Sequence, residues 1–281
     1  MRNAYRLLFA GLIAGILLIL IPVPGEARPA PDSFADLVEK LTPAVVNIAT
    51  SFSHEGRSAG ESPFDGLPPG SAPEEFHEFF NRRGGGPAQP ITSLGSGFIV
   101  DPNGLVVTNN HVIADADEIT VVLNDNSRLA ATVIGRDPKT DLALLKVDNG
   151  KSLPFVEFGD SDGARVGDWV IAIGNPFGLG NTVTAGILSA RGRDINAGPY
   201  DDFLQTDAPI NRGNSGGPMF DMNGKVIGVN TLIYSPSGGS VGIGFATPSA
   251  IALGVAVSLL GFFLQPQCPA KQQWHAAQTL P

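Results

Sequence analysis

The sequence predicts an all-β protein, either a β-barrel or a β-sandwich, and three observations support this fold class. Apolar runs of about four to eight residues, rich in Val and Ile, recur between Pro43 and Pro248. Turn residues separate these runs, and the 281-residue chain contains 35 Gly and 23 Pro. Only Ser33–Leu41 has a convincing helical period. Strands therefore do not alternate with helices as they do in parallel α/β sheets.

The expected elements begin with a helix over Ser33–Leu41 and continue as short strands. Gly97–Val100 and Leu105–Thr108 flank Asp101-Pro-Asn-Gly104, which is a strong hairpin signal. The other expected strands are Val45–Ile48, Ile119–Leu123, Ala131–Ile134, Leu142–Val147, Trp169–Ile173, Val183–Ser189, Met219–Phe220, Lys225–Asn230 and Gly242–Ala246.

Residues 1–27 have the pattern of a signal peptide. Two arginines precede an apolar run over residues 7–21, prolines end the run, and small residues lead to a cleavage site at Ala27. The run has about 15 residues, fewer than the roughly 20 that span a bilayer, so an uncleaved membrane anchor is the less favoured alternative. We expect the rest of the chain to lie outside the cytoplasm.

Two other segments differ in character from the strand region. Residues 53–92 are rich in Ser, Gly, Pro, Glu and Arg, which predicts a long loop. This loop is either a solvated insertion or a regulatory or oligomer-contacting element. Residues 251–281 form an atypical tail, in which the apolar run over residues 251–264 has no strand pattern and is too short to span a membrane.

Composition excludes several classes of function. The 18 Lys and Arg against 27 Asp and Glu give a formal net charge of −9, which is unsuited to binding the phosphates of nucleic acid. A single cysteine, Cys268, allows neither an intramolecular disulfide nor a cysteine-based zinc site. No H-E-x-x-H motif indicates a metal site, and the Gly-rich stretch 174–180 lacks the Lys of a phosphate loop. We expect no cofactor and no metal.

Only one of the four histidines, His111, lies in the strand region. A lone histidine is more often structural than catalytic, so its role depends on its neighbours. Asp141 directly precedes the apolar strand Leu142–Val147, where a buried carboxylate would need a partner. Taken alone, Asp141 is better explained as a turn residue.

Ser215 lies in the sequence Asn211-Arg-Gly-Asn-Ser-Gly-Gly-Pro218. Glycines on both sides let the backbone adopt positive φ and aim successive N–H groups at one point. We expect Gly213, Asn214 and Ser215 to form an oxyanion hole in this way. A Gly-rich hairpin turn is the alternative, although such a turn needs a much less specific sequence.

Together, His111, Asp141 and Ser215 have the pattern of a catalytic triad. The order His, Asp, Ser along the chain is the chymotrypsin order, whereas the two other named orders begin with Asp or Ser. His111 would accept the proton of Ser215, and Asp141 would hold the imidazole tautomer and stabilise the imidazolium. An esterase of the α/β-hydrolase fold is disfavoured, because its histidine comes last and only His275 follows Ser215.

The chain resembles the HtrA (Do-like, or Deg) family of extracytoplasmic serine endopeptidases over about residues 35–250. The resemblance implies a trypsin-like protease domain over residues 28–250, made of two chymotrypsin-like six-stranded antiparallel β-barrels. These would cover about residues 34–150 and 151–250, with the active site in the cleft between them. The matching stretches are Leu94-Gly-Ser-Gly-Phe-Ile99, Thr108-Asn-Asn-His-Val112, Thr140-Asp-Leu-Ala-Leu-Leu-Lys-Val147, Ala172-Ile-Gly-Asn-Pro-Phe-Gly178 and Gln205-Thr-Asp-Ala-Pro-Ile-Asn-Arg-Gly-Asn-Ser-Gly-Gly-Pro218.

The resemblance also implies a function. It predicts an endopeptidase that degrades unfolded or misfolded proteins in the bacterial periplasm through an acyl-enzyme, as a homotrimer, with loose membrane association as a further option. Trypsin-like enzymes that cut after Lys or Arg carry an Asp six positions before the nucleophile, where this chain has Pro209. We therefore expect an apolar specificity pocket, with substrate contacts from Ile210, Asn230 and Thr231.

The resemblance ends at about residue 250. Family members continue there with a charged amphipathic helix and one or two PDZ domains, and residues 251–281 match neither. We interpret this segment as a premature end or a change of reading frame, with a genuine short variant as the alternative. The alternative function is a non-catalytic holdase, in which the triad is never assembled because regulatory C-terminal parts are missing.

Overall fold

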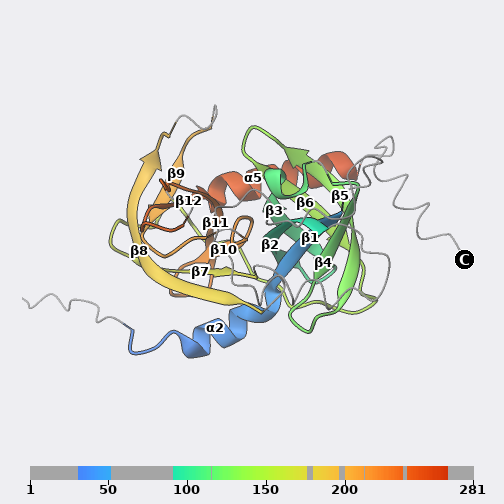
Figure 1. Ribbon diagram of the computed structural model, residues 1–281, viewed down its shortest axis with the longest axis horizontal. Helices are drawn as coiled ribbons and strands as arrows, with labels where there is room; N and C mark the ends of the chain where they lie inside the picture. The colour runs from blue at the N-terminus through green and yellow to red at the C-terminus, as the bar shows by residue number, and fades with distance from the viewer. Residues whose placement is uncertain are drawn as a thin grey trace, which may run out of the picture. The chain divides into compact units, whose positions relative to one another are not determined.

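Two closed six-stranded antiparallel β-barrels make up the computed structural model (Figure 1). It describes residues 31–51, 91–114, 116–175, 180–195, 200–211, 213–236 and 239–264. The all-β fold class and the two-barrel architecture are thereby confirmed. The predicted signal peptide and all but the last two residues of the predicted loop 53–92 lie outside the described residues.

The first barrel is hydrogen-bonded in the order β1-β2-β3-β6-β5-β4. Its interior is filled by aliphatic side chains such as Ile48, Val106 and Leu145, which alternate with outward positions as the strand period requires. The predicted hairpin is confirmed, because Gly104 at φ +93° donates its N–H to the Asp101 carbonyl at 2.9 Å. The strands are β1 Val45–Ser51, β2 Ile91–Asp101, β3 Leu105–Asn109, β4 Glu118–Val122, β5 Arg128–Asp137 and β6 Leu142–Val147.

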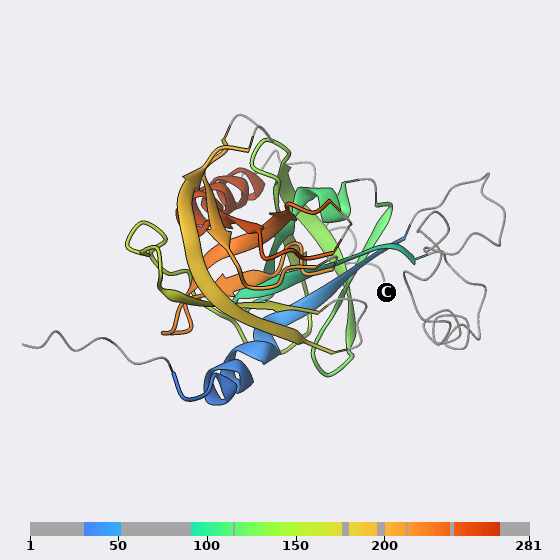
Figure 2. The same ribbon diagram turned by 60° about the vertical axis from the view of Figure 1, so that its left-hand side comes forward.

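The second barrel has the order β10-β11-β12-β9-β8-β7, and its long strand β8 curves around it (Figure 2). Its core includes Leu188, Leu204 and Met219. The pattern did not predict β9, which is short, follows two aspartates and is held by its pairing with β8 and β12. The strands are β7 Trp169–Gly174, β8 Thr182–Arg193, β9 Phe203–Thr206, β10 Pro218–Phe220, β11 Val226–Ile233 and β12 Gly244–Pro248.

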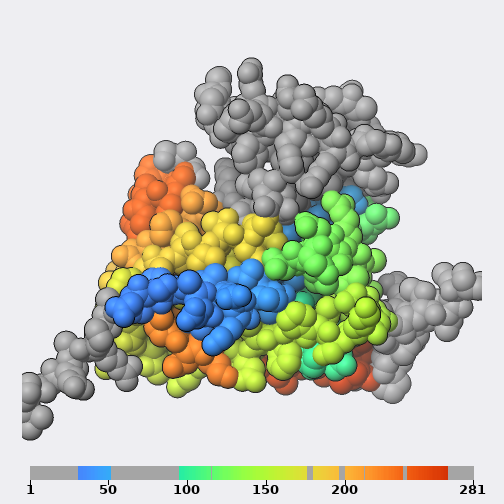
Figure 3. All heavy atoms as spheres, turned by 90° about the horizontal axis from the view of Figure 1, so that it is seen from below, coloured from blue at the N-terminus to red at the C-terminus, as the bar shows by residue number. Residues whose placement is uncertain are grey.

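The predicted N-terminal helix is confirmed as α2 (Ala35–Leu41), which continues into the short 3-10 helix η1 (Thr42–Ala44). It lies across the surface of the second barrel (Figure 3). There Leu37 and Leu41 pack over Gly224, where an added Cβ would lie 3.2 and 3.3 Å from their methyl carbons.

The 15-residue helix α5 (Ser249–Phe263) forms where the sequence indicated no regular element. It packs against β5 and β6 of the first barrel and against β11 and β12 of the second (Figure 1). The segment is apolar around almost its whole circumference, so its hydropathy shows no 3.6-residue period. Its outward side accordingly exposes large apolar residues, namely Leu253, Val257 and Phe262.

Candidate active site

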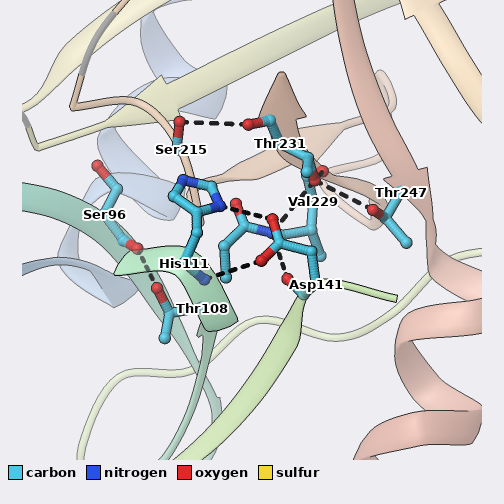
Figure 4. Close-up of polar contacts among 9 residues, drawn as sticks. Ser96, Thr108, His111, Asp141, Ser215, Val229, Thr231 and Thr247 are labelled. Atoms are coloured by element: carbon cyan, nitrogen blue, oxygen red, sulfur yellow. Dashed lines mark hydrogen bonds and ion pairs between the residues drawn. The ribbon is translucent and has the colours of Figure 1, made fainter. Parts of the chain in front are cut away.

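The imidazole of His111 and the carboxylate of Asp141 are in direct contact (Figure 4). The ring Nδ1 lies 2.5 Å from Asp141 Oδ2, and Asp141 Oδ1 accepts the backbone N–H of His111 at 2.8 Å. Because a carboxylate only accepts hydrogen bonds, Nδ1 carries the proton and Nε2 is left as an acceptor. The two side chains are 46% and 27% exposed, so the pair is accessible to a substrate.

The pairing of β3 with β6 explains why these two residues meet. Asn109 ends β3 and is paired with Leu142, the first residue of β6. One step further, the N–H of Asn110 donates to the Asp141 carbonyl at 3.0 Å, and Asn109 Nδ2 donates to the same oxygen at 2.8 Å. These bonds hold Asp141 at φ +55°, which is uncommon for a residue other than glycine. The one-turn helix α4 (Asn110–Ile113) then presents His111 to this carboxylate.

Ser215 belongs to the second barrel, in a turn formed by residues 213–217 just before β10, which we call the Ser215 turn. The turn is tied to β11, because Gly216 donates to the Asn230 carbonyl and Asn230 donates to the Gly217 carbonyl, both at 2.8 Å. Gly216 has φ +84°, and a Cβ there would collide with the Ser96 carbonyl oxygen. Glycine is therefore required at this position both by conformation and by space.

The Ser215 hydroxyl lies on the imidazole side of the turn (Figure 4). In this structure it donates to the Thr231 carbonyl oxygen at 3.4 Å rather than to the ring of His111. Such looseness is common in substrate-free enzymes, where the nucleophile and its base align only when the substrate binds.

The backbone amides expected to form an oxyanion hole differ in their partners. The N–H of Asn214 donates to the Asn211 carbonyl at 3.1 Å. Within the described part of the chain, no acceptor takes the N–H of Gly213 or of Ser215. Gly213 has φ +92°. Among the described residues, the N–H groups of Gly213 and Ser215 therefore remain available to a ligand, whereas the N–H of Asn214 between them is used within the chain.

The three residues expected to contact substrate lie in different surroundings. Ile210 is only 2% exposed, and it packs so closely on Gly244 that a Cβ there would lie 2.8 Å from Ile210 Cγ1. Asn230 is fully buried, and its Nδ2 donates to the Pro218 carbonyl at 3.1 Å. The Thr231 hydroxyl donates to the Val229 carbonyl at 2.9 Å, and its oxygen lies 3.0 Å from Thr247 Oγ1, with which it shares a hydrogen bond (Figure 4).

Sequence reasoning did not identify a cluster of buried polar residues that joins the two barrels next to Ser215. Asn47 Nδ2 donates to the carbonyls of Gly95 at 3.1 Å and Asn175 at 2.9 Å. Ser96 binds the Ser215 turn directly. The only available signal was that Ser96 and Asn175 lie within stretches that carry the family resemblance, and this signal does not say what they bind.

Two carboxyl groups on the surface have shifted pKa values. The pKa of Glu157 is lowered by a hydrogen bond from Lys225 and by the charge of that lysine. The pKa of Asp125 is lowered mainly by hydrogen bonds from the side chain and backbone of Ser127. Both groups lie on the exposed surface, so solvent screening keeps their contribution to stability small.

The described residues contain neither a metal-binding cluster nor a membrane-spanning helix. In those ranges no three His, Cys, Asp or Glu side chains gather closely enough to hold a metal ion. None of the helices found there has the length and apolar character needed to cross a bilayer.

Comparison with known proteins places the chain in a family. The model of the trypsin-like peptidase domain matches residues 95–229. A relative from Brucella suis biovar 1 (strain 1330), named "Probable periplasmic serine endoprotease DegP-like", is 51% identical over 88% of this chain and 55% of its own length. A relative of the same name from Rhizobium meliloti (strain 1021) is 46% identical over 90% of this chain and 55% of its own length. This chain thus spans about half the length of the curated relatives that it matches.

Solved structures agree with this placement. The structure titled "HtrA-type protease AlgW with decapeptide" is 43% identical, with a TM-score of 0.66, over 82% of this chain and 68% of its own. At this TM-score and identity the two chains share a fold over the matched region. From the trypsin-like domain match, these identities and this fold, we conclude that the chain belongs to the HtrA-type, DegP-like family of trypsin-like serine proteases.

Proposed function

We propose that this protein is a serine endopeptidase that hydrolyses peptide bonds through an acyl-enzyme intermediate. One observation carries the proposal. The carboxylate of Asp141 holds His111 at two points, with Oδ2 2.5 Å from the ring Nδ1 and Oδ1 accepting the backbone N–H at 2.8 Å, so that Nε2 is the ring nitrogen that can take the proton of Ser215. A structural histidine needs no such two-point anchor, whereas a general base must be kept in one tautomer and one orientation.

The reaction follows from these roles. Ser215 Oγ attacks the carbonyl carbon of the substrate peptide while His111 Nε2 takes its proton, and the ionised Asp141 stabilises the resulting imidazolium. The amides of Gly213 and Ser215 donate to the developing oxyanion. His111 then protonates the leaving amine, and a water molecule activated by the same ring releases the acyl group.

The proposed substrates are unfolded or misfolded proteins in the periplasm. Relatives at about half identity are named periplasmic endoproteases, and an export signal over residues 1–27 would bring the chain to that compartment. Pro209 and the buried Ile210 supply no charge for a Lys or Arg side chain. We therefore propose that small aliphatic residues such as Val, Ile or Ala precede the cut bond.

We also propose that the protease domain, residues 28–250, assembles as a homotrimer. The support is the family assignment alone. Light scattering of the purified chain measures the mass directly, and a monomer at micromolar concentration would contradict the proposal.

The activity is tested by incubating the purified protein, expressed from the full chain, with reduced casein. Ser215→Ala should lower turnover on the order of 10⁶-fold, whereas the control Ser258→Ala, on the exposed side of α5, should cut as the unmodified protein does. If neither the unmodified protein nor the variants cut casein although all are folded and bind it, a non-catalytic holdase replaces the endopeptidase.

A further inference from the structure

Ser96 is a fully buried serine on β2 whose hydroxyl and backbone N–H both bind the Ser215 turn. Its hydroxyl donates to the Gly213 carbonyl at 2.6 Å and accepts the N–H of Asn175 at 2.8 Å. Its backbone N–H donates to the Ser215 carbonyl at 2.8 Å. Its carbonyl accepts the Thr108 hydroxyl at 2.7 Å, which fixes Ser96 to its own barrel (Figure 4).

These bonds fix the orientation of peptide groups in the turn. The peptide unit between Gly213 and Asn214 is held at both ends, its carbonyl by Ser96 Oγ and its N–H by the Asn211 carbonyl. The next peptide unit is held through the Asn214 carbonyl, which accepts the N–H of Gly217 at 3.0 Å. Its N–H, that of Ser215, is thereby aimed in one direction.

Gly213 has no side chain to restrain its backbone conformation. It lies at φ +92°, and glycine visits positive and negative φ about equally, so its own backbone does not choose the direction of its N–H. A bond to its carbonyl oxygen holds the following peptide unit in place and so restricts from outside the rotations about the Gly213 backbone that set the direction of its N–H. The Ser96 hydroxyl makes this bond from the other barrel, 117 positions away along the chain.

We propose that Ser96 is a positioning residue for the oxyanion hole, which it preorganises by locking the Gly213 carbonyl. This inference rests on the proposed endopeptidase function. Docking of the two barrels does not depend on the Ser96 hydroxyl alone, because Asn47 independently joins the carbonyls of Gly95 and Asn175. Removing the hydroxyl should therefore release the carbonyl end of the Gly213–Asn214 peptide unit without separating the barrels.

The chain offers a closely matched control in Ser249, at the start of α5. Ser249 is 1% exposed, donates its hydroxyl to the Gly159 carbonyl at 2.7 Å and accepts the N–H of Ser161 at 3.2 Å. Ser96→Ala and Ser249→Ala thus each remove a buried hydroxyl that donates to one backbone carbonyl and accepts one backbone N–H. Their melting temperatures should fall by similar amounts.

The kcat values of Ser96→Ala and Ser249→Ala should differ. With the full chain and a fluorogenic peptide, Ser96→Ala should lower kcat about 10-fold or more, since losing one oxyanion donor outright costs about 10² to 10³-fold. KM and the midpoint of the pH–rate profile should not change, because the substrate contacts and the His111–Asp141 pair are intact. Ser249→Ala should keep the kcat of the unmodified protein. Equal losses of kcat in the two variants, or no loss in either, would overturn the proposal.

A second measurement does not require activity. Amide hydrogen exchange of the peptide spanning residues 205–217 should accelerate in Ser96→Ala and not in Ser249→Ala. If the unmodified protein cuts no substrate, the endopeptidase assignment fails, and this exchange experiment still decides whether Ser96 holds the turn. Equal exchange in the two variants refutes the positioning role even when the enzyme is active.

Discussion

Replacing Asp141 by asparagine should abolish most activity without unfolding the protein, and the geometry explains why. Asp141 Oδ1 accepts the backbone N–H of His111 at 2.8 Å, and Oδ2 lies 2.5 Å from the ring Nδ1. An amide has one oxygen only. The backbone N–H is always a donor, so the amide oxygen must take the position of Oδ1 and the amide NH₂ must face Nδ1. Nδ1 then has to be an acceptor, the ring proton moves to Nε2, and Nε2 no longer accepts the proton of Ser215.

The expected loss in kcat is about 10⁴-fold, the size seen when this substitution imposes the wrong tautomer in a Ser-His-Asp protease. At about 1.36 kcal/mol per factor of ten, the activation barrier rises by about 5.4 kcal/mol. The assay compares kcat and KM of Asp141→Asn with the unmodified protein on a fluorogenic peptide. The melting temperature should change little, because the bond to the backbone N–H is retained.

Asp137→Asn is the matched control for this experiment. The carboxylate of Asp137 also accepts two hydrogen bonds at 3.0 Å, from the N–H of Lys139 and from the Thr140 hydroxyl, but it does not contact His111. The kcat of Asp137→Asn should stay within about twofold of that of the unmodified protein, since surface substitutions are usually nearly neutral. A loss of less than tenfold in Asp141→Asn, or an equal loss in the control, would refute the tautomer argument.

Three further outcomes are expected. Gly216→Ala should lower the free energy of unfolding by about 2–5 kcal/mol, because an alanine there would be strained in the left-handed backbone conformation and would overpack against the Ser96 carbonyl. Denaturant titration measures this loss, and an unchanged midpoint would contradict it. Lys225→Met should raise the lowered pKa of Glu157 toward its ordinary value, as NMR titration would show. A lowered carboxyl pKa contributes its full stability above the unfolded-state pKa and loses it as the pH falls through the folded-state pKa, so any stability difference should be present at neutral pH and vanish in acid. Val257→Glu, at a position 62% exposed on α5, should reduce aggregation in light scattering without changing the melting temperature.

The sequence was most informative where local chemistry is sufficient. The hairpin at Asp101–Gly104 was predictable because Asn-Gly turns and flanking strands have a local signature. Helix α5 was not predictable, because a segment that is apolar all round shows no period from which to read a helix. Strand β9 was missed for a different reason, since its hydrogen bonds come from β8 and β12 rather than from its own composition.

The strand-rich fold class and the identities and order of His111, Asp141 and Ser215 could be predicted from the amino-acid sequence. The bonds that hold these three residues in place depend on how the strands and the two barrels pack. The pairing of β3 with β6 brings Asp141 onto His111, and the closure of two barrels places Ser96 against a carbonyl 117 positions away. Periodicity reports which face of a segment is buried, but it does not specify which distant backbone atom a buried hydroxyl will bind, because that depends on how separate strands pack in space.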